Sequence, residues 1–316
     1  MTHRLRFAPP GPTGEILTEV TLRCIQGRYL LRPSKRLNSL VIGVLARAQA
    51  AFQVRVHACS FMTNHAHLLL SVASQKDLSS FMNFVGSNIA REVNLLQEWD
   101  GKVWARRYSS IPVVGGESIE VAHLEYLLSQ GTKEGLVDSP LRWPGINAAE
   151  ALSNGRNLQG IWVNRTALNK ARRRHPKKQI RSIEFEERLT LVLSPLPCWE
   201  DLPAAEHQVR IRGLVRQIED SARQARKGAA VAGTQAVLRQ DPHTRLPRLV
   251  TSPAPIVHAS SRKVRLAFLE AYRLFVRAFR AAVERQRDGD LTVEFPVGSF
   301  PPARPFVEAI QGLKPG

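Results

Sequence analysis

Four polar side chains in this sequence have the types and the spacing needed to bind a divalent metal and attack a phosphodiester. His65 and His67 are two residues apart in an apolar stretch, and Tyr126 and Gln130 are four residues apart farther along the chain. Two imidazoles and one amide oxygen can coordinate a divalent ion, and a positioned tyrosine hydroxyl can act as a nucleophile. This chemistry requires elements that bring the four side chains together.

The sequence predicts an extended strand for the histidine pair and a helix for the tyrosine. Residues i and i+2 of a strand point to the same face, so His65 and His67 are expected to lie side by side. Around Tyr126, apolar residues recur at intervals of three and four between Gly115-Gly116 and Gly131, as an amphipathic helix requires. Tyr126 and Gln130 then lie one turn apart on one helix face.

The sequence around these residues resembles the single-tyrosine HUH transposases, and most closely the REP-associated tyrosine transposases. The resemblance covers about residues 15 to 150. It is carried by four segments in the order of the family: Phe61-Met62-Thr63-Asn64-His65-Ala66-His67-Leu68-Leu69-Leu70, Val103-Trp104-Ala105-Arg106-Arg107-Tyr108, Tyr126-Leu127-Leu128-Ser129-Gln130-Gly131-Thr132-Lys133-Glu134-Gly135-Leu136-Val137 and Arg142-Trp143-Pro144.

The resemblance implies a metal-dependent DNA strand transferase. His65, His67 and Gln130 are then expected to bind Mg²⁺ or Mn²⁺, and Tyr126 to attack a phosphate of single-stranded or hairpin DNA. A homodimer of this chain is the assembly considered. The product implied is a 5′-phosphotyrosine with a free 3′-hydroxyl, and the cleavage sites implied are REP-like DNA hairpins. Gln130-Gly131 departs from the Asn-Pro that usually follows the tyrosine helix in the REP-associated group.

Other assignments of the same residues stay open. Tyr108 follows two arginines and is an alternative nucleophile, although nothing near it supplies a ligand four residues on. His123 is expected to be a solvated helix histidine, and His57 a structural one. Two alternative functions remain. One is a catalytically inactive DNA-binding regulator derived from the same family, and the other is a metal-dependent phosphodiesterase that uses water as its nucleophile.

The charge of the chain indicates a polyanionic partner. The net charge is +18 and the pI is about 10.8. Residues 1 to 150 hold 16 basic and 12 acidic residues, which leaves 29 and 15 for the rest, so most of the excess lies after residue 150. Lys and Arg that contact phosphates release counterions, and this favours nucleic acid as the partner. The residues expected to contact DNA are Trp104, Arg106, Arg107, Arg172, Arg173, Arg174, Lys177 and Lys178.

Length and patterning predict an α+β protein in two parts. Residues 1–150 are expected to form the catalytic domain, a mostly antiparallel sheet with packed helices, and residues 151–316 a basic, mainly helical DNA-binding extension with a linker near 151–180. Helical periodicity appears at 184–193, 204–227 and 262–287. The three cysteines are isolated, and no apolar run is long enough for a membrane span. We therefore expect a cytoplasmic, nucleoid-associated protein with no membrane partner.

Overall fold

A five-stranded sheet forms the centre of the computed structural model, which describes residues 7, 9, 14–247 and 254–303. All neighbouring strands are antiparallel except the last pair, which is parallel. The expected α+β class with a mostly antiparallel sheet is therefore confirmed. The strand order is β2 (Val54–Phe61), β3 (His65–Val72), β1 (Ile16–Arg23), β4 (Ser109–Val114) and β7 (His258–Ala259).

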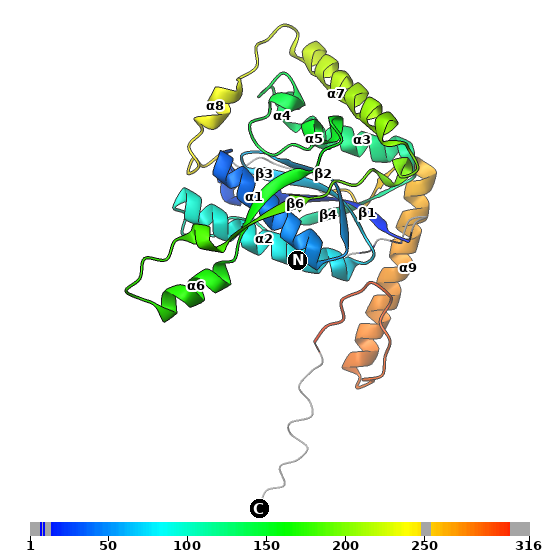
Figure 1. Cartoon of the computed structure of the whole chain (residues 1–316). Helices are drawn as coiled ribbons and strands as arrows, with labels where there is room; N and C mark the ends of the chain where they lie inside the picture. The colour runs from blue at the N-terminus through cyan, green and yellow to red at the C-terminus, as the bar shows by residue number, and fades with distance from the viewer. Residues whose placement is uncertain (1–6, 8, 10–13, 248–253, 304–316) are drawn as a thin grey trace, which may run out of the picture.

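Helices cover both faces of this sheet (Figure 1). Helices α1 (Lys35–Ala51) and α2 (Gln75–Gln97) lie on one face, and α3 (Glu117–Leu128), α5 (Ala149–Ser153) and α7 (Ala204–Arg226) lie on the other. The alternation of strand side chains matches this arrangement, because Val20 belongs to the core under α1 and α2 whereas Leu17 and Leu69 belong to the core under α3 and α7.

Serine caps fix the start of the two helices on the first face. The hydroxyl of Ser34 accepts a hydrogen bond from the Leu37 backbone N–H at the start of α1. The hydroxyl of Ser74 does the same for Asp77 at the start of α2, and Asp77 adds a negative charge to that first turn. Both caps satisfy backbone donors that a helix leaves unpaired.

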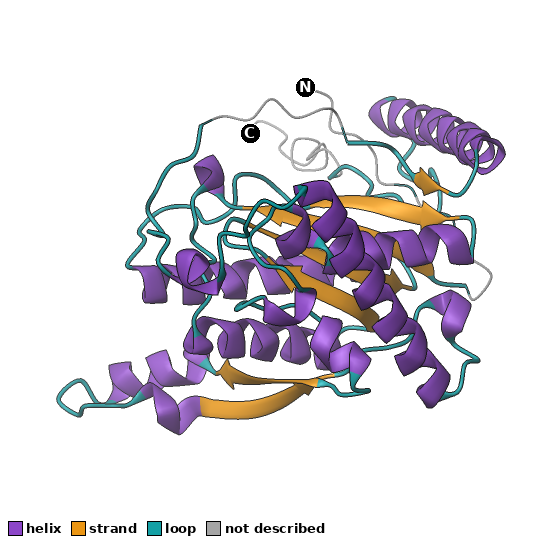
Figure 2. Cartoon of the chain, turned by 90° about the horizontal axis from the view of Figure 1, so that it is seen from above, coloured by secondary structure: helices purple, strands orange, loops and turns teal. Residues whose placement is uncertain are grey.

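A second, two-stranded sheet packs on the outer side of α1. It pairs β5 (Leu158–Val163) with β6 (Glu186–Leu191) in antiparallel register, and Figure 2 shows it apart from the central sheet. Two glycines permit the approach, since a Cβ on Gly43 would lie 2.1 Å from the Ile161 carbonyl and one on Gly160 would lie 2.2 Å from the Gly43 nitrogen. The helix predicted at 184–193 is therefore wrong, because this segment pairs as a strand.

Residues after 150 cover both edges of the central sheet. At one edge, the Ser194 N–H donates to the Val56 carbonyl of β2 at 2.9 Å. At the other, β7 pairs with β4, and the Ser260 N–H donates to the Val114 carbonyl at 3.2 Å. Both hydrophobic cores also contain residues from this later part, such as Leu191 in one and Ile211 in the other. The division of the chain near residue 150 stays a prediction.

The remaining elements are short or peripheral. The segment 151–180, expected as a linker, contains the end of α5, all of β5, and α6 (Arg165–Arg174). Helix α9 (Arg262–Arg287) stands at the side of the molecule beside β7 (Figure 2). Within the described residues, no helix has both the length and the apolar character needed to cross a bilayer. The other helices are α4 (Gln130–Lys133), α8 (Thr234–Leu238), and the 3₁₀ turns Ile25–Gly27, Pro140–Arg142, Ser182–Phe185 and Pro197–Trp199.

Candidate active site

The histidine pair lies at the start of β3, on the face of the sheet that α3 covers. His65 pairs in register with Arg23 and His67 with Thr21 of β1, and the two imidazole centroids are 5.1 Å apart. The Nδ1 atom of His65 lies 2.6 Å from Asn64 Oδ1, and that of His67 lies 3.1 Å from Glu19 Oε1. If each Nδ1 carries the proton that these oxygens accept, each Nε2 presents a free lone pair, which is the form that binds a metal.

The surroundings of His65 keep its imidazole neutral. Burial, followed by the positive charges of His67 and Arg23, lowers the pKa of His65 to about 3, although a hydrogen bond with the Gln130 side chain opposes the shift. A neutral imidazole is the state that can coordinate an ion. His65 therefore needs no deprotonation step at neutral pH before it can bind a metal.

Tyr126 lies in the last turn of α3, with its ring edge-on to that of His67 at a centroid distance of 5.6 Å. The chain kinks at Ser129, and Gln130 begins the short helix α4. The Gln130 Nε2 donates to the Tyr126 backbone carbonyl at 2.8 Å, which fixes the carboxamide beside the tyrosine. The spacing of four residues thus places both side chains at the histidine pair.

The phenol of Tyr126 is held in its protonated form. Burial and the negative charge of Glu19 raise its pKa, although a hydrogen bond with Gln130 and the positive charge of Arg23 act in the opposite direction. Because the phenolate is the stronger nucleophile, positive charge close to this hydroxyl, or a base that takes its proton, would favour a reaction there.

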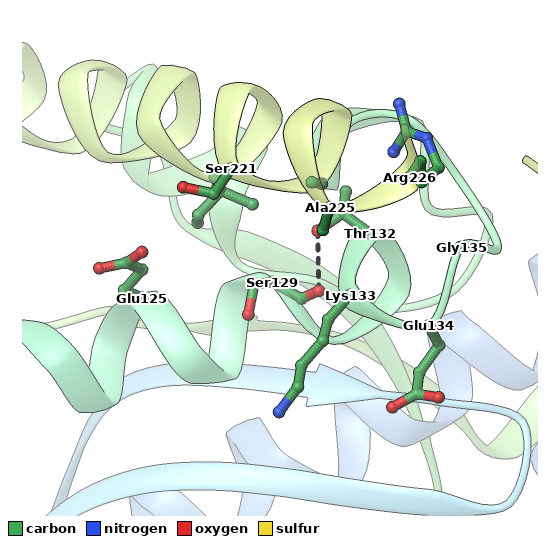
Figure 3. Close-up of a pocket in the computed structure, with 11 residues that line it drawn as sticks. Glu125, Ser129, Thr132, Lys133, Glu134, Gly135, Ser221, Ala225 and Arg226 are labelled. Carbon is green, nitrogen blue, oxygen red and sulfur yellow. Dashed lines mark hydrogen bonds between the residues drawn. The ribbon is translucent and has the colours of Figure 1, made fainter. Parts of the chain in front are cut away.

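Two cations that sequence reasoning did not select flank the tyrosine. Arg23 is exposed at the end of β1, opposite His65. Lys133 of α4 places its Nζ 5.0 Å from the centroid of the Tyr126 ring. Figure 3 shows the Lys133 side chain pointing away from α7. Residues of α4, together with Ser221 and Arg226 of α7, line a hollow of about 460 Å³. Both cations can attract a phosphate to the tyrosine.

A buried carboxylate, Glu19, connects the histidine pair to two further histidines. Its Oε1 contacts His67, and its Oε2 lies 2.9 Å from His123 Nδ1 and 3.3 Å from His258 Nε2. Burial alone would raise the pKa of Glu19, but contacts with the imidazoles of His123, His258 and His67 outweigh it and hold the pKa far below its usual value. The carboxylate is therefore ionised and can orient His67.

These contacts correct one expectation and add two residues. His123 is not solvated, because its side chain is 12% exposed and bonds to Glu19. The sequence signal for Glu19 was available, since it is the one acidic residue of a strand that is otherwise buried through its first five residues. His258 has no local signal, because its position depends on the path of the chain back to β4.

The first group of expected DNA contacts lies on the side of the sheet covered by α2. Trp104, Arg106 and Arg107 line a hollow of about 490 Å³ together with Gly86 and other residues of α2. The Trp104 Nε1 donates to the Gly86 carbonyl at 2.8 Å, so the indole is held by the helix, whereas both arginines are exposed. The arginines stay candidates for contact with DNA.

The second group lies on and after α6. Arg172, Arg173 and Arg174 form its last turn, Lys177 and Lys178 follow it, and all five are exposed. In Figure 1, α6 projects from the side of α1 and α2, away from α3. The structure thus does not bring these basic residues to Tyr126, and their contact with DNA stays a prediction.

Tyr108 and His57 occupy positions unlike that of Tyr126. Tyr108 packs against the core under α1 and α2, with the Arg107 guanidinium 5.7 Å from its ring centroid. His57 is buried in β2, where Nδ1 lies 2.6 Å from the Pro195 carbonyl and Nε2 lies 2.8 Å from Ser71 Oγ. The structural role predicted for His57 is therefore confirmed.

Comparison with known family models gives a match over part of the chain. The family model described as "Transposase IS200 like" matches residues 26–130, about a third of the chain. The comparison with curated proteins found no match.

Among solved structures, the chain is similar to a REP-associated tyrosine transposase bound to a REP hairpin. That likeness has 15% identity and a TM-score of 0.39, and covers 49% of this chain and 86% of the other. A protein from Deinococcus radiodurans R1 described as a transposase candidate has 16% identity and a TM-score of 0.28, and the match covers 37% of this chain and 91% of the other. Both likenesses are too distant to support a functional assignment.

Proposed function

We propose that this protein cleaves and rejoins single-stranded DNA through a covalent bond to Tyr126. The match of residues 26–130 to the IS200-like transposase family model supports this proposal. The observation that carries the proposal is the position of the Tyr126 ring, 5.6 Å from that of His67, which itself lies 5.1 Å from that of His65. The nucleophile and two metal-ligating side chains thus converge on one face of the sheet, as a metal-assisted attack on phosphorus requires.

The residues fit a divalent ion. His65 and His67 offer Nε2 lone pairs because their Nδ1 atoms are engaged by Asn64 and Glu19. The Gln130 carboxamide lies within hydrogen-bonding reach of His65 and Tyr126, so its oxygen faces the same place. Two imidazoles and one amide oxygen suit Mn²⁺ or Mg²⁺ with a phosphate as a further ligand. The bound ion would neutralise and polarise the attacked phosphate.

The side chains around Tyr126 prepare the attack. Gln130 and Arg23 favour ionisation of the phenol, against the burial and the Glu19 charge that oppose it. Lys133, over the ring, adds a positive charge that can hold the DNA backbone. In the reaction, the Tyr126 oxygen forms a bond to phosphorus and the bond to the 3′-oxygen breaks, the leaving oxygen taking a proton. The product is a 5′-phosphotyrosine, and the reverse attack by a 3′-hydroxyl rejoins a strand.

The experiment is to incubate the purified protein with 5′- and 3′-labelled single-stranded hairpin DNA and Mn²⁺, followed by a denaturing gel. We expect an adduct that resists denaturant and carries the label 3′ of the cleavage site. Tyr126→Phe should abolish cleavage and adduct while DNA affinity changes little, because one hydroxyl contributes little to a charge-dominated interface. Tyr108→Phe is the matched control and should retain both.

Other results would assign a different function. Adduct that persists in Tyr126→Phe and disappears in Tyr108→Phe would move the nucleophile to Tyr108. Metal-dependent cleavage without any adduct would indicate water as the nucleophile. Specific DNA binding by the wild type with neither cleavage nor adduct would favour the DNA-binding regulator.

A further inference from the structure

Three metal-ligating side chains meet where β1, α3 and β7 come together, beside the histidine pair but apart from it. The side chains are Glu19, His123 and His258, and their ligand atoms all lie within 4.8 Å of one another. Glu19 uses Oε2 here, whereas its Oε1 faces His67. The rings of His123 and His258 are 4.0 Å apart, so both imidazoles approach the same carboxylate oxygen.

One nitrogen of this cluster lacks a hydrogen bond. His258 Nε2 is shielded from solvent and, within the described part of the chain, has no hydrogen-bond partner, although Glu19 Oε2 is 3.3 Å away. A buried polar atom left unpaired is destabilising, and such atoms are uncommon in folded proteins. A cation between His258 and Glu19 would satisfy this nitrogen.

We propose that Glu19, His123 and His258 form a second metal site, which binds a transition-metal ion of the zinc class. Ligands at about 2.1 Å around a tetrahedral ion are separated by about 3.4 Å. The observed separations of 2.9 and 3.3 Å between Glu19 Oε2 and the two imidazole nitrogens are close to this value. Two imidazoles and one carboxylate favour Zn²⁺ over Mg²⁺, which prefers an all-oxygen shell and keeps its waters.

The bound ion joins distant parts of the chain. Through Glu19, His123 and His258 it links strand β1, helix α3 and strand β7. Helix α3 also carries Tyr126, three residues after His123. The β7 strand contributes only two residues to the sheet, so its own pairing with β4 is short. The ion therefore fastens β7, and the chain leading into α9, to the catalytic face.

The test measures Zn²⁺ binding to the tag-free, full-length chain after chelator treatment, by calorimetry and by metal analysis after dialysis. A His65→Ala background removes one imidazole of the catalytic pair, so that the remaining tight site can be identified. In this background we expect one equivalent of Zn²⁺ and a rise in Tm of about 5 °C at a free Zn²⁺ concentration of about 100 Kd.

Adding His258→Phe to that background retains a planar ring beside His123 but removes both nitrogens. We expect its affinity for Zn²⁺ to fall by about 100-fold and the Zn²⁺-dependent Tm rise to disappear. Adding His175→Ala, at an exposed position at the end of α6, is the matched control and should change neither. Metal-free melting curves establish that each variant folds.

Two results would overturn the proposal. One is that the wild type binds Zn²⁺ and the His65→Ala variant binds none. The other is unchanged Zn²⁺ affinity when His258→Phe, or His258→Ala if the phenyl ring does not fit, is added to the background. Neither result depends on DNA cleavage, so the site and the proposed strand transfer succeed or fail separately.

Discussion

His57 should make the stability of this protein fall between pH 6.5 and pH 4. Its imidazole is buried in β2, between the Pro195 carbonyl and the Ser71 hydroxyl. Burial lowers the pKa of His57 to about 4, against the opposing effect of hydrogen bonds to the Ser194 and Pro195 carbonyls. The neutral ring donates to Pro195 and accepts from Ser71, so protonation would add a buried charge.

The magnitude follows from the difference between the two pKa values. In the unfolded chain His57 binds a proton near pH 6.5, whereas the folded chain resists it down to about pH 4. The stabilisation by neutral His57 is thus complete above pH 6.5 and decreases as the pH falls to 4. Between pH 7.5 and pH 4.5 the loss is about 2.5 kcal/mol in the free energy of unfolding.

Urea unfolding of the wild type and of His57→Asn at pH 7.5 and pH 4.5 isolates this contribution. Asparagine can still donate to Pro195 but does not titrate, so histidines elsewhere affect both proteins equally. The difference in the free energy of unfolding between the wild type and His57→Asn should shift by about 2.5 kcal/mol against the wild type at the lower pH. An advantage that stays constant between the two pH values would mean that His57 is not a buried neutral imidazole, and that segment 194–195 is not held against β2 in this way.

Three further sets of substitutions test the metal site, the packing of the second sheet and the basic helix. His65→Ala should reduce adduct formation by about 100-fold, and a chelator should do the same to the wild type. Gln130→Ala should reduce adduct formation by only about tenfold, because water can replace an oxygen ligand. Full activity of the wild type in the presence of chelator would exclude a metal. Gly43→Ala should cost about 3 kcal/mol in urea unfolding because its Cβ meets the β5 backbone, while Gly213→Ala, with open space in α7, should be neutral or slightly stabilising. Replacing Arg172–Arg174 by glutamine should reduce the slope of log affinity against log salt by about 2 for single strands, and an unchanged slope would mean that α6 does not contact DNA.

The sequence was most informative where function depends on local spacing. The period of two places His65 and His67 on one face, and the interval of four brings Tyr126 and Gln130 together across the kink between α3 and α4. The environment of His123 was not predicted, because its partner Glu19 is 104 residues away in another element. Such a contact depends on strand register and helix packing, which single-sequence periodicity does not define.

The later half of the chain shows a second limit. Helices α7 and α9 fall within their predicted ranges, because their apolar residues recur at helical intervals. Segment 184–193 does not form a helix, since Leu189 and Leu191 of β6 face the α1 side of the second sheet. That surface exists only because Gly43 and Gly160 let the strand approach the helix. Tertiary packing here outweighs the local preference.

The same contacts decide how the two proposed parts of the protein can be separated experimentally. A fragment that ends near residue 150 would lose Leu191 and Ile211 from the two cores and uncover both edges of the sheet. Loss of DNA affinity in such a fragment would then follow from unfolding as readily as from lost charge. Charge replacement on α6 leaves both cores intact, because its three arginines are exposed. A shallower salt dependence with an unchanged yield of adduct at saturating DNA would therefore assign α6 to binding and Tyr126 to chemistry within one folded unit.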